Sequence, residues 1–483
     1  MAYKTILYGA GKRCVTLCKI LSALNVKHII IVDSNSDTWG KRIEGYSVES
    51  PEIIKTIKEM YFCITVANLA VADEIRNDIK DRFLCDLNRE ISLNKLILKS
   101  YKESSLVRDK ILKHSVVKNK KRNVLFDSCN GFGLGGVEAW TVDVCSALIK
   151  EGKEDIYIVS DNGVYIIPAI LDGHVIYADI NHKTRFLPES VFSIIKKIIP
   201  YLPCKIITRD VDDVMVAAYL IKCCYPNMVE IISVIHDSKK ESCDAYIEFR
   251  ECSDLYIGVS KDIKADMIQR GVEPEKVTSM TCPFNCVQIL DRTYTENIAM
   301  PIRIGYAGRM DGMEHSQKRM DLLLKTMKLL LENNVNFVWE LAGDGAVRKE
   351  MEDYIHFNKM EDRVKFLGTI SRSEIPFFWK RQDICINLSD FEGRSISIIE
   401  AMGNGVVPVV TATSGVKEDI TDGINGYIVP LGDYLLAVER IKYLEKHRNC
   451  LEKMGKLAHE EVYPKSLMET HVDFWRGIFS RKF

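Results

Sequence analysis

Two glutamates eight positions apart, Glu392 and Glu400, are the side chains of this sequence best suited to bind a polar ligand. Glu392 lies on a glycine-bearing loop, and Glu400 lies inside an apolar run of helical periodicity. Gly393, Arg394 and Ser395 lie between them, so their backbone N–H groups gather where the predicted helix begins. Such an end suits a phosphate or a polyol, because unsatisfied N–H groups and the helix dipole attract oxygen-rich, negative groups. A carboxylate on the helix could accept two hydroxyls of a sugar ring.

Two buried strands must position this loop and helix. Residues 384–388 form the strand before the loop, and residues 406–410 form the strand after the helix. A parallel sheet built from such units binds ligands outside the C-terminal ends of its strands. The ligand is therefore expected at that edge of the sheet. Taken as a lone pair, the glutamates could instead be a solvated helix residue and a partner of the helix dipole.

Glycines and polar side chains also follow apolar strands elsewhere in the chain. The segments are Gly135-Gly136-Val137-Glu138, Val234-Ile235-His236-Asp237, Gly258-Val259-Ser260-Lys261, Gly305-Tyr306-Ala307-Gly308-Arg309, Leu341-Ala342-Gly343-Asp344-Gly345, Phe366-Leu367-Gly368 and Gly423-Ile424-Asn425-Gly426-Tyr427. Together with the block from Phe391 to Val409, this ordered set resembles the family 4 retaining glycosyltransferases. The resemblance covers residues 123–483.

The resemblance implies an α/β protein with the GT-B fold of two facing Rossmann-like domains. It also implies transfer of a hexose-type sugar from a nucleotide-diphosphate sugar to a saccharide or lipid-linked saccharide, in surface polysaccharide assembly. Neither a cofactor nor a metal is expected, since enzymes that resemble this chain stabilise the departing diphosphate with protein cations.

The resemblance assigns roles to individual residues. Arg309 and Lys318 would clamp the diphosphate, although nine positions separate them and Lys318 is followed by Arg319 rather than glycine. The sequence leaves open whether Lys318 or Arg319 reaches the phosphates. Glu392 would bind hydroxyls of the transferred sugar beside the N–H groups of 393–395, and Glu400 the nucleotide ribose.

Two further segments would face them from the other domain. His236 would contact the donor sugar or the leaving phosphate, unless it is a structural histidine at a strand end. Gly135 and Gly136 would let the backbone approach the diphosphate closely, unless they form only a turn.

The first part of the chain has a dinucleotide-type pattern of its own. Gly9 and Gly11 follow a strand, and Asp33 ends the next strand as a ribose-binding carboxylate would. Cys14 replaces the third glycine of that pattern, which weakens it. The segment resembles the small Rossmann-like domain, of the nucleotide-sugar- or CoA-binding type, that precedes sugar-modifying transferases. Two readings stay open: binding of a nucleotide or nucleotide sugar, and docking to a protein partner or to a second copy.

The patterns divide the chain into successive parts. These are a small Rossmann-like domain (1–117) ending in a helix at 103–115, a basic linker (118–122), an acceptor domain (123–290), a hinge (291–300), a donor domain (301–465), and a C-terminal helix (466–483) that crosses back to the acceptor domain.

Charge and cysteine content limit the partners and the compartment. The formal net charge is −1, which gives no reason to expect a nucleic-acid partner, although residues 1–122 carry a net +9 and the rest −10. The 15 cysteines include no C-x-x-C pair, which indicates a reducing compartment. The sequence shows neither a signal-peptide pattern nor an apolar segment long enough to span a membrane, so a cytoplasmic protein is expected. If its acceptor is lipid-linked, the protein is expected to bind peripherally at the inner face of the membrane. Residues 191–199 could form a basic-apolar surface for that contact, but a helix covering the core fits them better.

Other readings of the chain remain. Asp210 and Asp212 form a D-x-D pattern, but Asp213 follows directly, so helix capping is favoured over metal binding. The rival functions are a non-catalytic scaffold that binds nucleotide sugars, and a bifunctional enzyme with a second sugar-nucleotide activity in residues 1–117.

Overall fold

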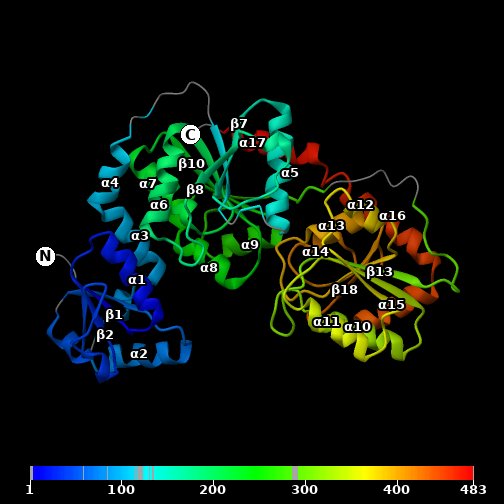
Figure 1. Cartoon of the computed structure of the whole chain (residues 1–483), viewed down its shortest axis with the longest axis horizontal. Helices are drawn as coiled ribbons and strands as arrows, with labels where there is room; N and C mark the ends of the chain where they lie inside the picture. The colour runs from blue at the N-terminus through cyan, green and yellow to red at the C-terminus, as the bar shows by residue number, and fades with distance from the viewer. Residues whose placement is uncertain are drawn as a thin grey trace.

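The computed structural model describes residues 4–57, 59–83, 85–114, 116, 123–129, 131–132, 135–284 and 292–481. Three sheets follow one another along the chain, and we name the parts built around them the first, second and third domains (Figure 1). The predicted linker 118–122, the boundary at residue 290 and the first hinge residue lie outside the described residues.

The first domain contains a five-stranded sheet in the order β3-β4-β2-β1-β5, parallel except for β3. Its elements are β1 (Lys4–Tyr8), α1 (Lys12–Ala23), β2 (Ile29–Val32), β3 (Arg42–Ile43), β4 (Tyr46–Glu49), β5 (Met60–Ile64), α2 (Leu69–Asp81), α3 (Leu93–Glu103) and α4 (Ser105–Leu112). The sequence predicts one helix at 103–115, but the structure has two helices, α3 and α4, in this region. The extended backbone of Ser104 separates them.

The second domain contains a seven-stranded parallel sheet in the order β12-β11-β10-β9-β6-β7-β8. Its elements are β6 (Asn123–Ser128), α5 (Gly136–Glu151), β7 (Asp155–Asp161), β8 (Val175–Ala178), α6 (Pro188–Ile198), β9 (Cys204–Thr208), α7 (Asp213–Cys224), β10 (Val229–Ile235), α8 (Lys240–Glu248), β11 (Leu255–Gly258), α9 (Lys261–Gln269) and β12 (Val277–Ser279).

The third domain contains a six-stranded parallel sheet in the order β15-β14-β13-β16-β17-β18. Its elements are β13 (Ile302–Ala307), α10 (Met320–Glu332), β14 (Phe337–Ala342), α11 (Arg348–Phe357), β15 (Val364–Gly368), α12 (Ile375–Lys380), β16 (Ile384–Asn387), α13 (Ile396–Gly403), β17 (Val407–Thr411), α14 (Val416–Asp419), β18 (Tyr427–Val429), α15 (Tyr434–Lys446) and α16 (Asn449–Val462). Strands β16 and β17 are buried along their whole length, because helices cover both faces of the sheet.

The first domain is packed directly onto the second. Helix α7 is buried along Asp213–Ile221, and α3 and α4 pack on it from the first domain (Figure 1). The Tyr101 hydroxyl donates to the backbone carbonyl of Phe186 at 2.7 Å, and Lys102 pairs with Glu251 at 2.8 Å. One hydrophobic core runs through both domains.

The C-terminal helix returns to the second domain. Helix α17 (Met468–Phe479) packs on α5, and the edge of the buried Trp475 ring meets the Phe126 ring of β6 (Figure 1). The chain therefore ends on the second domain after completing the third.

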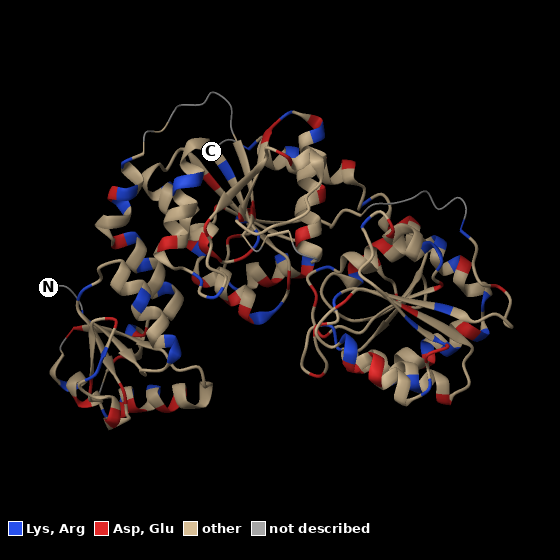
Figure 2. Ribbon diagram, viewed as in Figure 1, with Lys and Arg blue, Asp and Glu red and all other residues tan. Residues whose placement is uncertain are grey.

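The isoleucines of residues 191–199 are buried in α6 and at its end, so this segment covers the core. Within the described ranges, no helix combines the length and apolar character needed to cross a membrane. Basic and acidic side chains are interspersed over all three domains, and the basic first part shows both signs (Figure 2).

Candidate functional site

A cleft of about 610 Å³ lies between the second and third domains. Its wall in the second domain is formed by the start of α5 and the end of β10, and its wall in the third domain by the loops after β13, β14, β15 and β16. Nine predicted site residues line it: Gly135, Gly136, His236, Arg309, Lys318, Glu392, Arg394, Ser395 and Glu400. The C-terminal ends of two parallel sheets thus face each other across one space, as expected for ligand binding.

Gly393, the one further residue predicted for this site, lies where the domains touch and is not among those that line the cleft. A Cβ atom at this position would collide with the His236 carbonyl, so the two backbones could not approach this closely with any other residue. The Ser238 hydroxyl donates to the carbonyl of Glu392 at 2.8 Å beside this contact.

The Glu392 carboxylate is buried and bound by side chains from the same wall. Lys318 Nζ lies 2.6 Å from Glu392 Oε1, and Gln317 Nε2 donates to Glu392 Oε2 at 3.3 Å. The lysine and the glutamate therefore form a pre-ordered pair at the cleft surface. An ammonium group has three donor protons, so Lys318 can hold Glu392 and a phosphate oxygen together.

Arg319 points away from this pair. Its guanidinium binds Asp321 at 2.9 Å and Asp390 at 3.1 Å, and its backbone φ of +46° is left-handed. Lys318 lines the cleft, whereas Arg319 is not among the lining residues. Of the two, Lys318 is therefore the one placed to meet a ligand in the cleft. The sequence could not separate them, because adjacent basic residues differ only in the direction that the backbone gives them.

Arg309 is the most exposed of the four basic residues that line the cleft, with 54% of its side chain accessible. Its guanidinium lies 3.1 Å from Asp311 Oδ2. This exposed pair contributes little to stability, so Arg309 can exchange Asp311 for an incoming anion.

Glu400 lies at the buried end of the cleft. Burial raises the pKa of its carboxyl to about 7, partly offset by the positive charge of Arg372. Arg372 forms an ion pair with Asp143 of α5, so it joins the third domain to the second beside Glu400. No local pattern predicts this pair, because neither residue stands in a distinctive motif.

His236 is buried against aromatic rings of the second domain. Its ring lies edge-on to Trp140, with 4.7 Å between the ring centroids. Burial lowers the pKa of His236 to about 3, and Arg209 and His471 act in the same direction. The imidazole is therefore neutral at physiological pH, and its Nε2 has no hydrogen-bond partner in the described part of the chain.

Trp140 connects His236 to the C-terminal helix. The Trp140 indole N–H donates to His471 Nε2 of α17 at 3.2 Å. Burial lowers the pKa of His471 to about 3, which keeps this nitrogen free to accept. His471 is not among the predicted site residues; the helical spacing of aromatics near the C-terminus predicts only that this helix packs on the second domain or within its own.

Gly135 and Gly136 begin α5 at the opposite wall. Gly135 is the N-cap and supplies no side-chain cap, so the first N–H groups of α5 are directed toward the cleft. A 16-residue helix presents the positive end of its dipole there.

The predicted residues of the first domain lie apart from this cleft. Asp33 accepts hydrogen bonds from the N–H groups of Ala10 at 2.6 Å and Asn35 at 2.8 Å, so it closes the glycine loop. Gly9 has a φ of +103° and Gly11 caps α1 without a side chain. A ribose would have to share the Asp33 carboxylate with these N–H groups.

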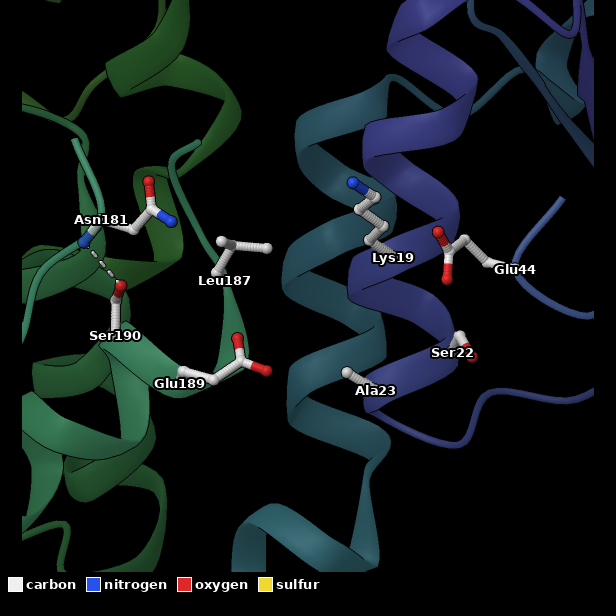
Figure 3. A pocket seen from close by; sticks show the side chains of 8 residues that line it. All are labelled: Lys19, Ser22, Ala23, Glu44, Asn181, Leu187, Glu189 and Ser190. Atoms are coloured by element: carbon white, nitrogen blue, oxygen red, sulfur yellow. Dashed lines mark hydrogen bonds between the residues drawn. The ribbon is translucent and has the colours of Figure 1, made fainter. Parts of the chain in front are cut away.

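A second hollow of about 530 Å³ lies between the first and second domains (Figure 3). Lys19 and Ala23 reach it from α1, and Leu187 and Glu189 from the start of α6. It contains none of the predicted site residues.

The D-x-D pattern is accounted for by other bonds. Asp212 caps α7 by accepting the N–H groups of Val214 and Met215, and Asp210 pairs with Arg185 at 2.7 Å. Asp212 also lies beside Asp127 and Cys129 in the interior, but both carboxylates already accept backbone N–H groups.

Family models match two parts of the chain. Residues 299–461 match the model described as Glycosyl transferases group 1, and residues 1–89 match C2185-like, N-terminal. The first match covers the third domain and the glutamate block.

Curated relatives align with about a third of the chain. The trehalose synthase of Pyrococcus horikoshii is 30% identical over 135 residues, covering 28% of this chain and 31% of the relative. The amylovoran biosynthesis glycosyltransferase AmsK of Erwinia amylovora is 26% identical, covering 35% and 39%. The lipopolysaccharide 1,6-galactosyltransferase of Escherichia coli K12 is 26% identical, covering 39% and 51%. The chain thus spans about a third to a half of these relatives' length.

Solved structures share the fold over a larger part. Anabaena Alr3699/HepE, in complex with UDP-glucose, has a TM-score of 0.60 at 17% identity, covering 74% of this chain and 99% of that chain. S. aureus TarM, in complex with Fondaparinux, alpha-GlcNAc-glycerol and UDP, has a TM-score of 0.51 at 14% identity, covering 99% and 100%. The predicted fold class is confirmed: two facing Rossmann-like domains of GT-B type, preceded by an additional one.

Proposed function

We propose that this chain is a retaining, metal-independent glycosyltransferase that moves a hexose-type sugar from a nucleotide-diphosphate sugar to a saccharide or lipid-linked saccharide in surface polysaccharide assembly. The observation that carries the proposal is the cleft itself. It brings four basic side chains, two buried carboxyl groups and a neutral histidine together from two domains, around a space of about 610 Å³.

In this proposal the donor spans the third-domain wall. Glu400 binds the ribose, Glu392 binds hydroxyls of the transferred sugar, and the backbone N–H groups of 393–395 lie beside the phosphates. His236 approaches from the opposite wall as an uncharged hydrogen-bonding group, since burial lowers its pKa to about 3.

Positive charge on the cleft walls supports metal independence. Lys318, Arg309 and the N-terminus of α5 can stabilise the diphosphate as the glycosidic bond breaks. The acceptor hydroxyl attacks from the face that the leaving group vacates and passes its proton to a phosphate oxygen. Glu392 is bound to Lys318 and Gln317, an arrangement suited to positioning rather than nucleophilic attack.

A UDP-sugar is the first donor to test, because HepE was solved with UDP-glucose. The test is a thermal-shift and hydrolysis panel of UDP-, GDP-, ADP- and TDP-sugars with EDTA present. One nucleotide sugar should raise Tm and slowly release its sugar. If no nucleotide sugar raises Tm or is hydrolysed, a non-catalytic scaffold becomes the better hypothesis. Hydrolysis that occurs only without EDTA would contradict metal independence.

For the first domain we propose docking rather than nucleotide binding. The occupied Asp33 carboxylate and the packing of α3 and α4 on α7 favour this role. Titration of the full chain with NAD, CoA and UDP-sugars should detect no binding site that is sensitive to Asp33→Ala. A binding site that is lost in this variant would instead support nucleotide binding by the first domain, and with it the hypothesis of a bifunctional protein.

We also propose that the chain is divided into the small Rossmann-like, acceptor and donor domains at the boundaries expected from the sequence, and that the protein is cytoplasmic. The described cysteines are free and mostly buried, which fits the reducing cytoplasm. Contact with the inner face of the membrane is proposed only for a lipid-linked acceptor, and flotation with anionic vesicles tests it.

A further inference from the structure

The segment expected as a hinge is bound to the third domain over its described part, residues 292–300. Arg292 begins this part, and its guanidinium forms hydrogen bonds to four backbone carbonyls: those of Trp379 at 3.1 Å, Lys380 at 3.2 Å, Asn404 at 3.1 Å and Gln382. Trp379 and Lys380 end α12, and Asn404 is the C-cap of α13. Carbonyls at a helix end lack partners within the helix and carry partial negative charge, so one cation stabilises both ends.

Tyr294 holds Arg292 in this position. Its ring lies over the guanidinium, with 4.5 Å between the ring centroid and Arg292 Cζ, and its hydroxyl donates to the Gly405 carbonyl at 3.0 Å. A Cβ atom at Gly405 or at Gly455 of α16 would collide with this hydroxyl. The two glycines therefore leave the space that the tyrosine fills.

The contacts of Arg292 lead directly to Glu400. The side-chain amide and the backbone N–H of Asn404 donate to the Glu400 carbonyl at 2.8 and 3.1 Å. On α12, which packs against α13 (Figure 1), Trp379 is buried, and its indole N–H has no hydrogen-bond partner within the described chain. Burial raises the pKa of Glu400 to about 7 and Trp379 opposes this rise, so the indole lies near the carboxyl.

Arg448 provides a contrast within the same segment. It is also buried, and it binds the carbonyls of Thr295 at 3.5 Å and Met300 at 3.1 Å. Its Nε donates to the Glu445 carbonyl of α15 at 2.8 Å. Arg448 therefore fastens the segment to the third domain, whereas the hydrogen bonds of Arg292 join α12 to α13.

We propose that Arg292 is a positioning residue for Glu400. By joining the ends of α12 and α13, it holds the Glu400 carboxyl at the buried end of the cleft, where the carboxyl accepts the ribose hydroxyls of the donor. The proposal rests on the proposed function, which gives Glu400 this ligand. Arg292 is not among the residues that line the cleft, so it acts through α13 and Trp379.

The test measures how strongly the protein distinguishes a ribose from its dideoxy analogue. UDP, GDP and ADP, each beside its 2′,3′-dideoxy counterpart, are titrated calorimetrically into the full-length protein. The measurements are made at pH 8, where most of the Glu400 carboxyl is ionised, since its pKa is about 7. For the nucleotide that binds, wild type should prefer the ribose form by about tenfold or more, as expected for hydrogen bonds to a charged group.

Three variants assign this preference. Arg292→Met removes all four hydrogen bonds and should reduce the preference to about threefold or less. Arg292→Lys keeps the charge but lacks the planar fork of donors, so its preference should fall between the two. The matched variant Arg448→Lys should keep the wild-type preference. Thermal unfolding shows whether each variant is folded, and if Arg292→Met is not, the two lysine variants decide.

The outcomes separate the inference from the proposed function. A preference that survives in the folded Arg292 variants would overturn the inference and leave the donor site standing. Equal losses in Arg292→Lys and Arg448→Lys would also overturn it, because a general loosening of the segment would then explain both. Nucleotide binding without a ribose preference in wild type would remove the ribose role of Glu400 and the inference with it. The absence of any nucleotide binding would remove the proposed function as well.

Discussion

At the scale of single residues, the site depends on which groups already have partners. Lys318 and Arg319 are adjacent and equally basic, yet one lies in the cleft beside Glu392 and the other is bound between Asp321 and Asp390. Of the two, only Lys318 lines the cleft, where the proposed function has it stabilise the charge that develops on a diphosphate.

We predict that Lys318→Ala lowers kcat by about 100-fold or more, the loss typical of a removed transition-state charge contact. Arg319→Ala should keep kcat within threefold of wild type and instead lower Tm, because it breaks a structural ion-pair network. Nucleotide-release kinetics and thermal unfolding of both variants check this. The reverse pattern would assign Arg319 to the phosphates.

Glu400 gives a prediction about pH. Its folded-state pKa of about 7 is above the ordinary value of 4.5, so the folded protein holds this proton more tightly than the unfolded chain does. Stability from the protonated carboxyl is fully present below about pH 4.5 and is lost as pH rises through 7. Wild type should therefore lose stability relative to Glu400→Gln over this window, by about 3 kcal/mol.

Thermal or urea unfolding between pH 5 and pH 8 measures the difference. The control Glu439→Gln changes an exposed carboxylate on α15 and should follow wild type at every pH. A pH-independent difference between wild type and Glu400→Gln would show that the carboxyl is ionised throughout the range.

At the scale of elements, α17 holds the second-domain wall of the cleft. His471 accepts the Trp140 N–H, and Trp140 supports the buried His236 ring. The last helix of the chain thus fixes a group that enters the site from another part of the sequence.

We predict that His471→Phe lowers kcat about tenfold with little change in the donor KM. The Trp140 N–H loses its acceptor, at a cost of about 1–3 kcal/mol, and His236 loses its fixed orientation. His471→Gln, which offers an amide oxygen to the indole, should recover most of the rate. Equal losses in both variants would reduce His471 to a packing role.

Helices α3 and α4 account for the apolar composition of α7. Val107 is buried in this contact, while the adjacent Leu106 is 39% exposed. A carboxylate at the buried position has no partner, whereas one at the exposed position stays in water.

Val107→Asp should therefore destabilise the protein by about 3 kcal/mol or more and promote aggregation, and Leu106→Asp should be close to neutral. Soluble yield and chemical unfolding compare the pair. Equal stability of the two variants would mean that the first domain is attached without supporting the second.

At the scale of the whole molecule, polar contacts bridge the cleft. Arg372 pairs with Asp143, and Ser260 Oγ lies 2.8 Å from Ser414 Oγ on the far side of the interface. Ser238 with the Glu392 carbonyl, the Lys261 N–H with Glu418 and the Gly415 N–H with Asp262 add to them, so the domains meet through individual polar contacts.

We predict that Arg372→Ala opens the cleft. Small-angle X-ray scattering should show a larger radius of gyration than that of wild type without ligand, and the donor KM should rise about tenfold because closure must then be driven by the donor. A saturating donor should restore the wild-type radius. An unchanged radius and KM would show that the ion pair does not hold the domains together.

The sequence by itself determined the parallel α/β class, whereas the GT-B arrangement of two facing domains was implied by the resemblance of its ordered motifs. Alternating buried strands and amphipathic helices specify parallel sheets, since this periodicity is local and repeats along the chain. The same regularity places Glu392 and Glu400 at a strand–loop–helix unit, so the sequence identifies them as candidate ligand residues. Such patterns also leave helix boundaries loose, which is why α3 and α4 differ from the helix expected at 103–115.

Tertiary structure alone decided which groups meet. Arg372 with Asp143, and Trp140 with His471, are brought together by the facing of two domains and the return of the last helix, and no local pattern encodes contacts between residues hundreds of positions apart. The partners of each ionisable group also decide its role. In the sequence, Lys318, Arg319, Asp33 and Glu400 are ordinary ionisable residues. Burial and neighbouring groups, which depend on the folded chain, separate them into a cation that lines the cleft, a structural cation, a loop-closing carboxylate and a carboxyl with a raised pKa.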